Sequence, residues 1–178
     1  MRLSKFGYYA DFFVYPALIA ALTLCAVHET TGPQLSAWLL FSLSGIAAWT
    51  IAEYFLHRTL FHKFPFLRQM HDDHHSMPKE LLGTPTWLSV AVGSMVMFGP
   101  LWWVTGFMIA SAISTGLMIG YLWYITVHHC NHHANPRHNT YLYWAKHRHA
   151  LHHYCGETRN FGVITDFWDR LFGTELQR

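Results

Sequence analysis

Histidine is the residue type in this chain whose number and spacing could do chemistry. The sequence holds 15 histidines, and 12 of them fall into three clusters: His57 to His75, His128 to His133, and His149 to His153. A neutral imidazole nitrogen is the commonest metal ligand in proteins, whereas buried imidazoles without hydrogen-bond partners destabilise a core. The clustering therefore favours metal binding over ordinary packing.

The spacing inside the clusters suits helices that present several imidazoles to one point. Residues three or four positions apart share a helix face, and the pattern His-x-x-His-His occurs at 71–75 and again at 149–153. His57 and His62 are five residues apart, so a regular helix must end or distort between them for both to face one point.

The cluster at 128–133 offers two competing pairs with i, i+4 spacing. One pair is His128 and His132, and the other is His129 and His133. Only one pair can face the other clusters, because adjacent residues lie about 100° apart around a helix. Spacing alone leaves this register open.

With only one pair from the cluster at 128–133, ten of the twelve clustered histidines are candidate ligands. Ten exceed the four to six ligands that one metal ion takes, so the sequence predicts two metal ions. Imidazole serves Zn, Cu, Fe and Ni alike, and spacing does not name the metal. Two carboxylates are expected to orient ligand imidazoles: Glu53, which lies one turn before His57 in an apolar segment, and Asp166 in the tail. The alternative for Glu53 is a hydrogen-bonded structural carboxyl.

The elements that must position these residues are membrane helices. Hydrophobic residues make up 52% of the chain and charged residues only 12%, which is about half the usual charged share and too little to cover a soluble globule. The formal net charge of +2 does not indicate nucleic-acid binding. We predict an all-α integral membrane protein with a four-helix bundle and a cytoplasmic histidine-rich helical cap.

Residues 1–178 are expected to form one membrane domain. The four predicted spans are 12–27, 35–56, 87–104 and 106–127, and the cap is built from 57–85 and 128–178. All 12 Lys and Arg residues fall in 1–5, 58–79 and 137–178, and the links at 28–34 and 103–106 have none. The positive-inside rule therefore makes both termini and all three histidine clusters cytoplasmic.

The histidine pattern resembles the histidine boxes of the fatty acid hydroxylase and sterol desaturase superfamily. The resemblance covers about Glu53 to Thr174 and includes Tyr141-Leu-Tyr, Asn160-Phe-Gly and the closing segment 167–174. The register of the family favours His128 and His132 over His129 and His133. The resulting ligand set is His57, His62, His71, His74, His75, His128, His132, His149, His152 and His153.

The resemblance implies an O2-dependent hydroxylase that acts on a membrane lipid. It also implies two iron ions as cofactors, and zinc can take the place of iron in the same sites. A fatty-acyl chain is the first choice of substrate, and a sterol or carotenoid, or desaturation at the same site, is the alternative. The sequence contains no cytochrome b5-like domain and no Gly-rich dinucleotide fingerprint. The electrons are therefore expected from a separate cytochrome b5- or ferredoxin-like donor. The protein itself is expected in the inner membrane if it is bacterial, or in the endoplasmic reticulum if it is eukaryotic.

Two other classes of protein could carry many histidines in a membrane. A metal carrier or sensor would place ligands along a path through the middle of its spans, whereas these clusters lie at one membrane face. A membrane cytochrome would need isolated axial histidines that face each other across spans, and 87–104 and 106–127 contain none. The sequence therefore favours the oxygenase.

Overall fold

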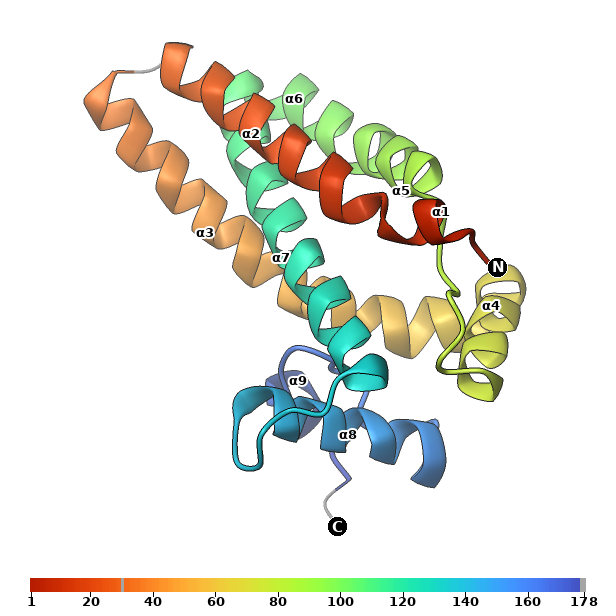
Figure 1. The fold of residues 1–178 in the computed structure, drawn as a ribbon. Coiled ribbons are helices and arrows are strands. Elements are labelled where there is room, and N and C mark those ends of the chain that lie inside the picture. Colours follow the sequence, from red (N-terminus) through yellow and green to blue (C-terminus); the bar gives the residue numbers. More distant parts are fainter. Residues whose placement is uncertain (30, 177–178) are drawn as a thin grey trace. The chain divides into compact units, whose positions relative to one another are not determined.

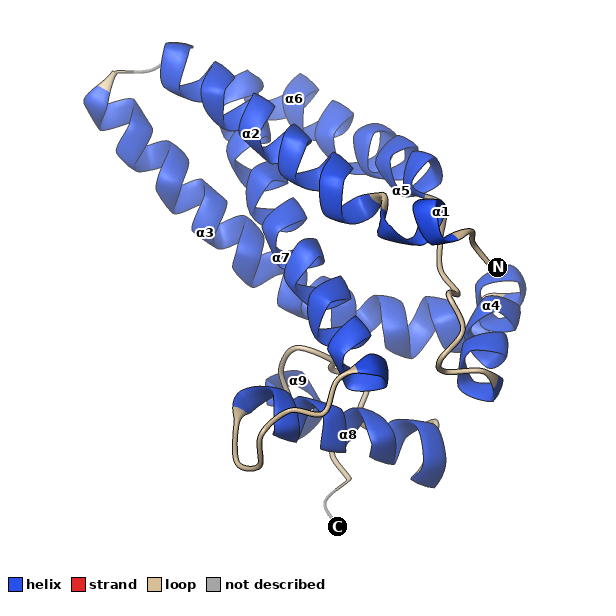
Figure 2. Ribbon diagram, in the orientation of Figure 1, coloured by secondary structure: helices blue, strands red, loops and turns tan. Residues whose placement is uncertain are grey.

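The computed structural model describes residues 1–29 and 31–176, and every regular element in these ranges is helical (Figure 1). Figure 2 shows helices joined by short loops in this part of the chain. In chain order the elements are α1 (Lys5–Tyr9), α2 (Asp11–Glu29), α3 (Gly32–Phe55), the π-helix η1 (Leu56–Phe61), α4 (Pro65–Ser76), α5 (Thr86–Gly93), the π-helix η2 (Ser94–Phe98), α6 (Gly99–Thr105), α7 (Phe107–His133), α8 (Tyr141–Cys155) and α9 (Phe167–Leu171). The predicted all-α class is confirmed.

Within residues 1–29 and 31–176, four helical stretches are long and apolar enough to cross a membrane. They are Lys5–Glu29, Gly32–Phe61, Thr86–Thr105 and Phe107–His133. Many of their large apolar side chains are exposed, and Trp103 is 90% exposed. Exposed apolar surface of this kind is expected where a helix faces lipid. The four predicted spans thus correspond to four candidate membrane-spanning helices, which extend further than the predicted segments.

The last span extends further than predicted because nothing in the sequence stops it at Val127. Helix α7 continues through the second histidine cluster and ends at His133. Proline disfavours the helical conformation of the residue before it, and Pro136 is the first such residue after the span. The histidines at 128–133 therefore lie on the C-terminal end of a helix.

The chain divides into two compact units. The histidine unit consists of residue 1 together with 50–82 and 123–178, and the apolar unit consists of 2–49 and 83–122. The division falls inside α3 and α7, so each of these helices supplies residues to both units. All ten predicted metal ligands belong to the histidine unit.

Within the apolar unit, α3 and α7 approach closely at two glycines. A Cβ atom at Gly116 would meet the backbone carbonyl of Ser42 and would lie 2.9 Å from the Cα atom of Gly45. Small residues allow such backbone contact between membrane helices. The same two helices share a buried hydrogen bond, in which Trp38 Nε1 donates to Ser111 Oγ over 3.0 Å.

Within the histidine unit, the chain after α8 packs against residues 50–55. Tyr54 is fully buried and its ring stacks on that of Phe172 at a centroid distance of 5.4 Å. Trp168 Nε1 donates a hydrogen bond to Thr50 Oγ1 over 3.0 Å. These contacts hold the segment after α8, residues 156–176, next to the helix end that carries His57. We call this segment the tail.

Candidate metal centre

The first pair of histidines is brought together by a change of helix type. Residues 56–61 form the π-helix η1, whose wider turn closes hydrogen bonds between residues five apart. The rings of His57 and His62 consequently stack, with centroids 5.4 Å apart and planes 21° from parallel. This is the distortion that the five-residue spacing required.

Helix α4 distributes its histidines over two faces. The Nε2 atom of His71 lies 3.2 Å from that of His57 and 3.0 Å from that of His75. The ring of His74 points elsewhere, with its centroid 4.6 Å from that of His132 and 4.9 Å from that of His153. One short helix thus contributes to two separate groups of imidazoles.

Helices α7 and α8 complete both groups. The Nε2 atom of His149 lies 2.8 Å from that of His132 and 3.1 Å from that of His153. The Nε2 atom of His152 lies 3.1 Å from that of His75. The i, i+3 step from His149 to His152 therefore directs consecutive turns of α8 toward different groups.

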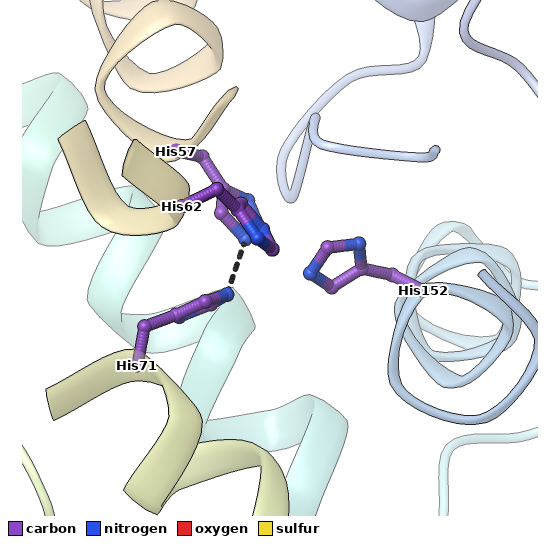
Figure 3. A group of neighbouring side chains, drawn as sticks. All are labelled: His57, His62, His71 and His152. Atoms are coloured by element: carbon purple, nitrogen blue, oxygen red, sulfur yellow. Dashed lines mark hydrogen bonds between the residues drawn. The ribbon is translucent and has the colours of Figure 1, made fainter. Parts of the chain in front are cut away.

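Two groups of four imidazoles result, and the ligand atoms within each group lie within 4.8 Å of one another. Figure 3 shows the first group pointing toward a shared space from η1 and the residue that caps it, from α4 and from α8. We call them site 1, formed by His57, His62, His71 and His152, and site 2, formed by His74, His132, His149 and His153.

The remaining two predicted ligands lie beside these sites. His75 contacts His71 and His152 of site 1 through its Nε2 atom. The ring of His128 lies 4.7 Å from that of His74 and 4.8 Å from that of His149, both of site 2. The ring of His75 also stacks on that of His153 of site 2 at 4.0 Å, so His75 contacts both sites and His128 lies beside site 2.

The donor atoms fit metal ions of the kind that imidazoles bind. Two cis ligands that lie about 2.1 Å from one metal are about 3 Å apart, and the Nε2 atoms of neighbouring histidines are separated by 2.8–3.2 Å. Two unprotonated nitrogens at this distance repel each other unless a cation lies between them. The Nε2 atoms of His62 and His74 are also buried with no hydrogen-bond partner in the part of the chain that the structure describes.

The imidazoles outside the membrane helices are held in the neutral form that binds metal. Burial, followed by the neighbouring imidazoles of His132 and His75, lowers the pKa of His74 to about 3. Burial also lowers the pKa of His152 to about 3, although the hydrogen bond to the Arg159 carbonyl opposes the shift. A histidine with such a pKa keeps its lone pair at neutral pH.

Backbone carbonyls of the tail orient two of the site 1 imidazoles. His57 Nδ1 donates to the carbonyl oxygen of Phe161 over 2.6 Å, and His152 Nδ1 donates to that of Arg159 over 2.7 Å. With the proton on Nδ1, the Nε2 lone pair of each ring is free to face the metal position. Such outer hydrogen bonds fix the tautomer and the ring orientation of ligand histidines.

Two buried carboxylates in turn hold this part of the tail. Asp169 accepts hydrogen bonds from the backbone N–H groups of Phe161 (2.9 Å) and Gly162 (2.8 Å). Glu53 Oε1 accepts from the N–H groups of Val163 (2.5 Å) and Ile164 (3.2 Å). Glu53 therefore supports the loop whose carbonyls orient the imidazoles, and no hydrogen bond among the described residues joins it to an imidazole.

The other predicted carboxylate has a different role. Asp166 forms ion pairs with Arg170 (2.7 Å) and Arg148 (3.8 Å), and none of its hydrogen bonds in the described residues reaches a histidine. Sequence reasoning missed Asp169, which also accepts a hydrogen bond from Thr174 Oγ1 over 2.7 Å. The available signal was an acidic residue placed between Trp168 and Arg170 in an otherwise aromatic tail.

The structure also separates the two candidate pairs on α7. The rings of His129 and His133 stack on each other at 4.5 Å and belong to neither four-membered group. His132 lies within site 2 and His128 lies beside it. This geometry favours the register chosen from the sequence.

A cavity of about 170 Å³ adjoins site 2. Its lining includes three site 2 imidazoles, those of His132, His149 and His153, together with Lys79 and Lys146. Site 2 therefore borders open space, whereas none of the four site 1 histidines lines this cavity.

Comparison with known proteins gives one family and several relatives. The family model described as fatty acid hydroxylase matches residues 42–174. A dihydroceramide fatty acyl 2-hydroxylase of Arabidopsis thaliana is 30% identical over 173 residues, which cover 89% of this chain and 69% of that protein. A fatty acid 2-hydroxylase of Rattus norvegicus is 32% identical over 142 residues, which cover 73% of this chain and 38% of that protein.

Two further comparisons cover nearly the whole chain. A ceramide very long chain fatty acid hydroxylase of Schizosaccharomyces pombe is 30% identical over 88% of this chain and 48% of its own length. The solved structure of full-length Scs7p, in which only the hydroxylase domain is visible, has a TM-score of 0.84 at 25% identity, covering 96% of this chain and 67% of that one. The chain thus spans less than half the length of the rat and fission yeast relatives.

Proposed function

This chain belongs to the fatty acid hydroxylase family, and from that premise we propose that it hydroxylates carbon 2 of a fatty acyl chain dissolved in the membrane. The family and its class of enzyme, a lipid hydroxylase, agree with the prediction from the histidine pattern. The choice of carbon 2 rests on the named activities of the relatives from Arabidopsis and rat. The acyl chain of a ceramide-like lipid is the first substrate to test, because relatives are named for ceramide and dihydroceramide.

The observation that carries this proposal is the pairing of two imidazole groups inside one unit. Eight imidazoles in two groups, with His75 and His128 beside them, suit two metal ions. We propose iron in both sites, where the bound pair would supply the redox chemistry that reduces O2. The reaction consumes one C–H bond, one O2, two electrons and two protons, and it yields one C–OH group and one water.

The chain's own residues hold, orient and place the centre. The imidazoles stay neutral, so that the sites keep the positive charge of the metals, which favours binding of O2. His57 and His132 lie in the last turns of the candidate spans Gly32–Phe61 and Phe107–His133. A methylene group near the polar end of a membrane-dissolved acyl chain could therefore reach the metals.

The orientation and the electron supply follow from charge and composition. We propose that the histidine clusters and both termini face the cytoplasm. All Lys and Arg residues outside the four candidate spans lie in segments that these spans place on one side, and Lys5 and Arg58 lie in the end turns of their spans nearest that side. The two electrons come from a separate cytochrome b5- or ferredoxin-like protein in this proposal.

The test is turnover of the purified protein under ¹⁸O-labelled dioxygen. The reaction contains a reducing partner and a panel of a ceramide, a free fatty acid, a sterol and a carotenoid, and the products are analysed by mass spectrometry. Label in a 2-hydroxyacyl product supports the proposal. An unlabelled new double bond indicates desaturation, labelled sterol or carotenoid indicates the other substrate class, and product formed without oxygen rejects an oxygenase.

A matched pair of variants ties turnover to the site. His152→Ala removes an imidazole that is fully buried in site 1, and His28→Ala removes one whose side chain is 85% exposed beside Glu29. Only the first variant should abolish turnover.

A further inference from the structure

We propose that the two metal sites are unequal, with site 1 binding its metal more tightly than site 2, and that Asp169 is the positioning residue responsible. This inference rests on the dinuclear centre of the proposed function. It does not depend on which lipid is the substrate.

Two of the four site 1 imidazoles are held by hydrogen bonds before a metal arrives. His57 and His152 each donate from Nδ1 to a tail carbonyl, over 2.6 Å and 2.7 Å. These bonds select the tautomer that leaves Nε2 free, and they hold both rings at a set angle. Partners of this kind typically change metal affinity by about 10- to 100-fold.

Site 2 lacks the equivalent support. The Nδ1 atoms of His149 and His153 are buried, and neither has a hydrogen-bond partner among residues 1–29 and 31–176. No hydrogen bond at Nδ1 in these residues therefore selects the tautomer of either ring. Site 2 also borders the cavity described above, in which the amide of Asn131 is 95% buried and makes no hydrogen bond in the same residues.

Asp169 connects the tail to site 1. Its Oδ1 atom accepts from the Phe161 N–H and from Thr174 Oγ1, and its Oδ2 atom accepts from the Gly162 N–H. The carbonyl of the same Phe161 residue receives the Nδ1 proton of His57. Asp169 is 1% exposed, so water cannot replace it, and the position of the carbonyl depends on this carboxylate.

The experiment measures metal release from the metal-loaded protein in detergent. A small water-soluble chelator in excess is added, and the loss of metal is followed over time. We expect two phases of equal amplitude, whose rates differ by about 10-fold or more. Variants that keep one site each, His62→Ala for site 2 and His132→Ala for site 1, assign the phases. A single phase, or faster release from site 1, overturns the proposal.

The positioning role is tested with two neighbouring aspartates of the tail. Asp169→Asn turns an amide N–H toward a donor and should accelerate only the slow phase by about 10- to 100-fold. Asp166→Asn, which alters only ion pairs with arginines, should leave both phases unchanged. Equal acceleration of both phases by Asp169→Asn would indicate general loosening and would overturn the role.

A milder variant covers the case in which Asp169→Asn does not fold. Thr174→Val removes the hydroxyl that donates to Asp169 and should accelerate the slow phase in the same direction by a smaller factor. No change in either phase would contradict the role of Asp169. Because release is measured without turnover, failure of the lipid assay leaves this result intact, and equal sites leave the lipid assay intact.

Discussion

Replacement of Gly162 by alanine should damage both stability and site 1. A Cβ atom at Gly162 would meet the backbone carbonyl of Thr165 and would lie 3.0 Å from Asp169 Oδ2. The backbone cannot shift without loss, because the Gly162 N–H is bonded to Asp169 and the next N–H, that of Val163, is bonded to Glu53. The methyl group must therefore displace the carboxylate or the loop.

The magnitude follows from these two effects. Overpacking of a tight site costs about 1–3 kcal/mol, and each hydrogen bond lost in the displacement costs about 1 kcal/mol more. We expect Gly162→Ala to lower the free energy of unfolding by about 2–4 kcal/mol. Since a displaced loop also moves the carbonyl that holds His57, metal release from site 1 should accelerate.

The assay compares denaturant unfolding in detergent, followed by circular dichroism, with metal content after dialysis. Gly156→Ala is the matched control, since the nearest atom to its added Cβ is Leu176 Cδ2 at 3.9 Å and its φ of 172° is open to any residue. A neutral surface change usually alters the free energy of unfolding by less than about 0.5 kcal/mol. If Gly162→Ala changes the free energy of unfolding by no more than this, the reasoning is refuted.

Four further predictions concern the metal centre and its orientation. His152→Ala should reduce the metal content below two ions per chain, whereas His28→Ala should keep two, as elemental analysis would show. His128→Ala should lose metal and His129→Ala should retain it, and the opposite result would move the register on α7 by one residue. The free energy of unfolding of the metal-free protein should fall as pH decreases from 6.5 toward 3. In this range the unfolded state takes up protons on its histidines, whereas the folded state, with the pKa of His74 at about 3, does not. A denaturant midpoint that does not change over this range would contradict the burial of neutral imidazoles. Tags at either terminus should be accessible only from the cytoplasmic side, and labelling from the other side would reverse the orientation.

The kinds of helix and the kind of chemistry could be predicted from local sequence pattern. Apolar length and the scarcity of charge predicted four membrane helices, because a span needs about 20 apolar residues whatever its neighbours are. The spacing of His71, His74 and His75 predicted convergent imidazoles, because helix periodicity is a local property. The five-residue step from His57 to His62 required a distorted helix, and the structure supplies a π-helix there.

Only the tertiary structure decided how the histidines divide between two sites. His74 joins His132, His149 and His153, while His71 joins His152 and His57. Sequence spacing cannot predict this division, because it depends on which face of α4 lies against which turn of α8.

The tertiary structure also decided which carboxylate supports the centre. Asp166 and Asp169 are three residues apart in one aromatic tail, and only the packing of that tail buries Asp169 against the N–H groups of Phe161 and Gly162. Asp166 meets arginines instead. Local sequence pattern indicates which interactions a residue can make. It does not indicate partners that lie more than a hundred residues away, such as Val163 for Glu53, because folding brings these residues together.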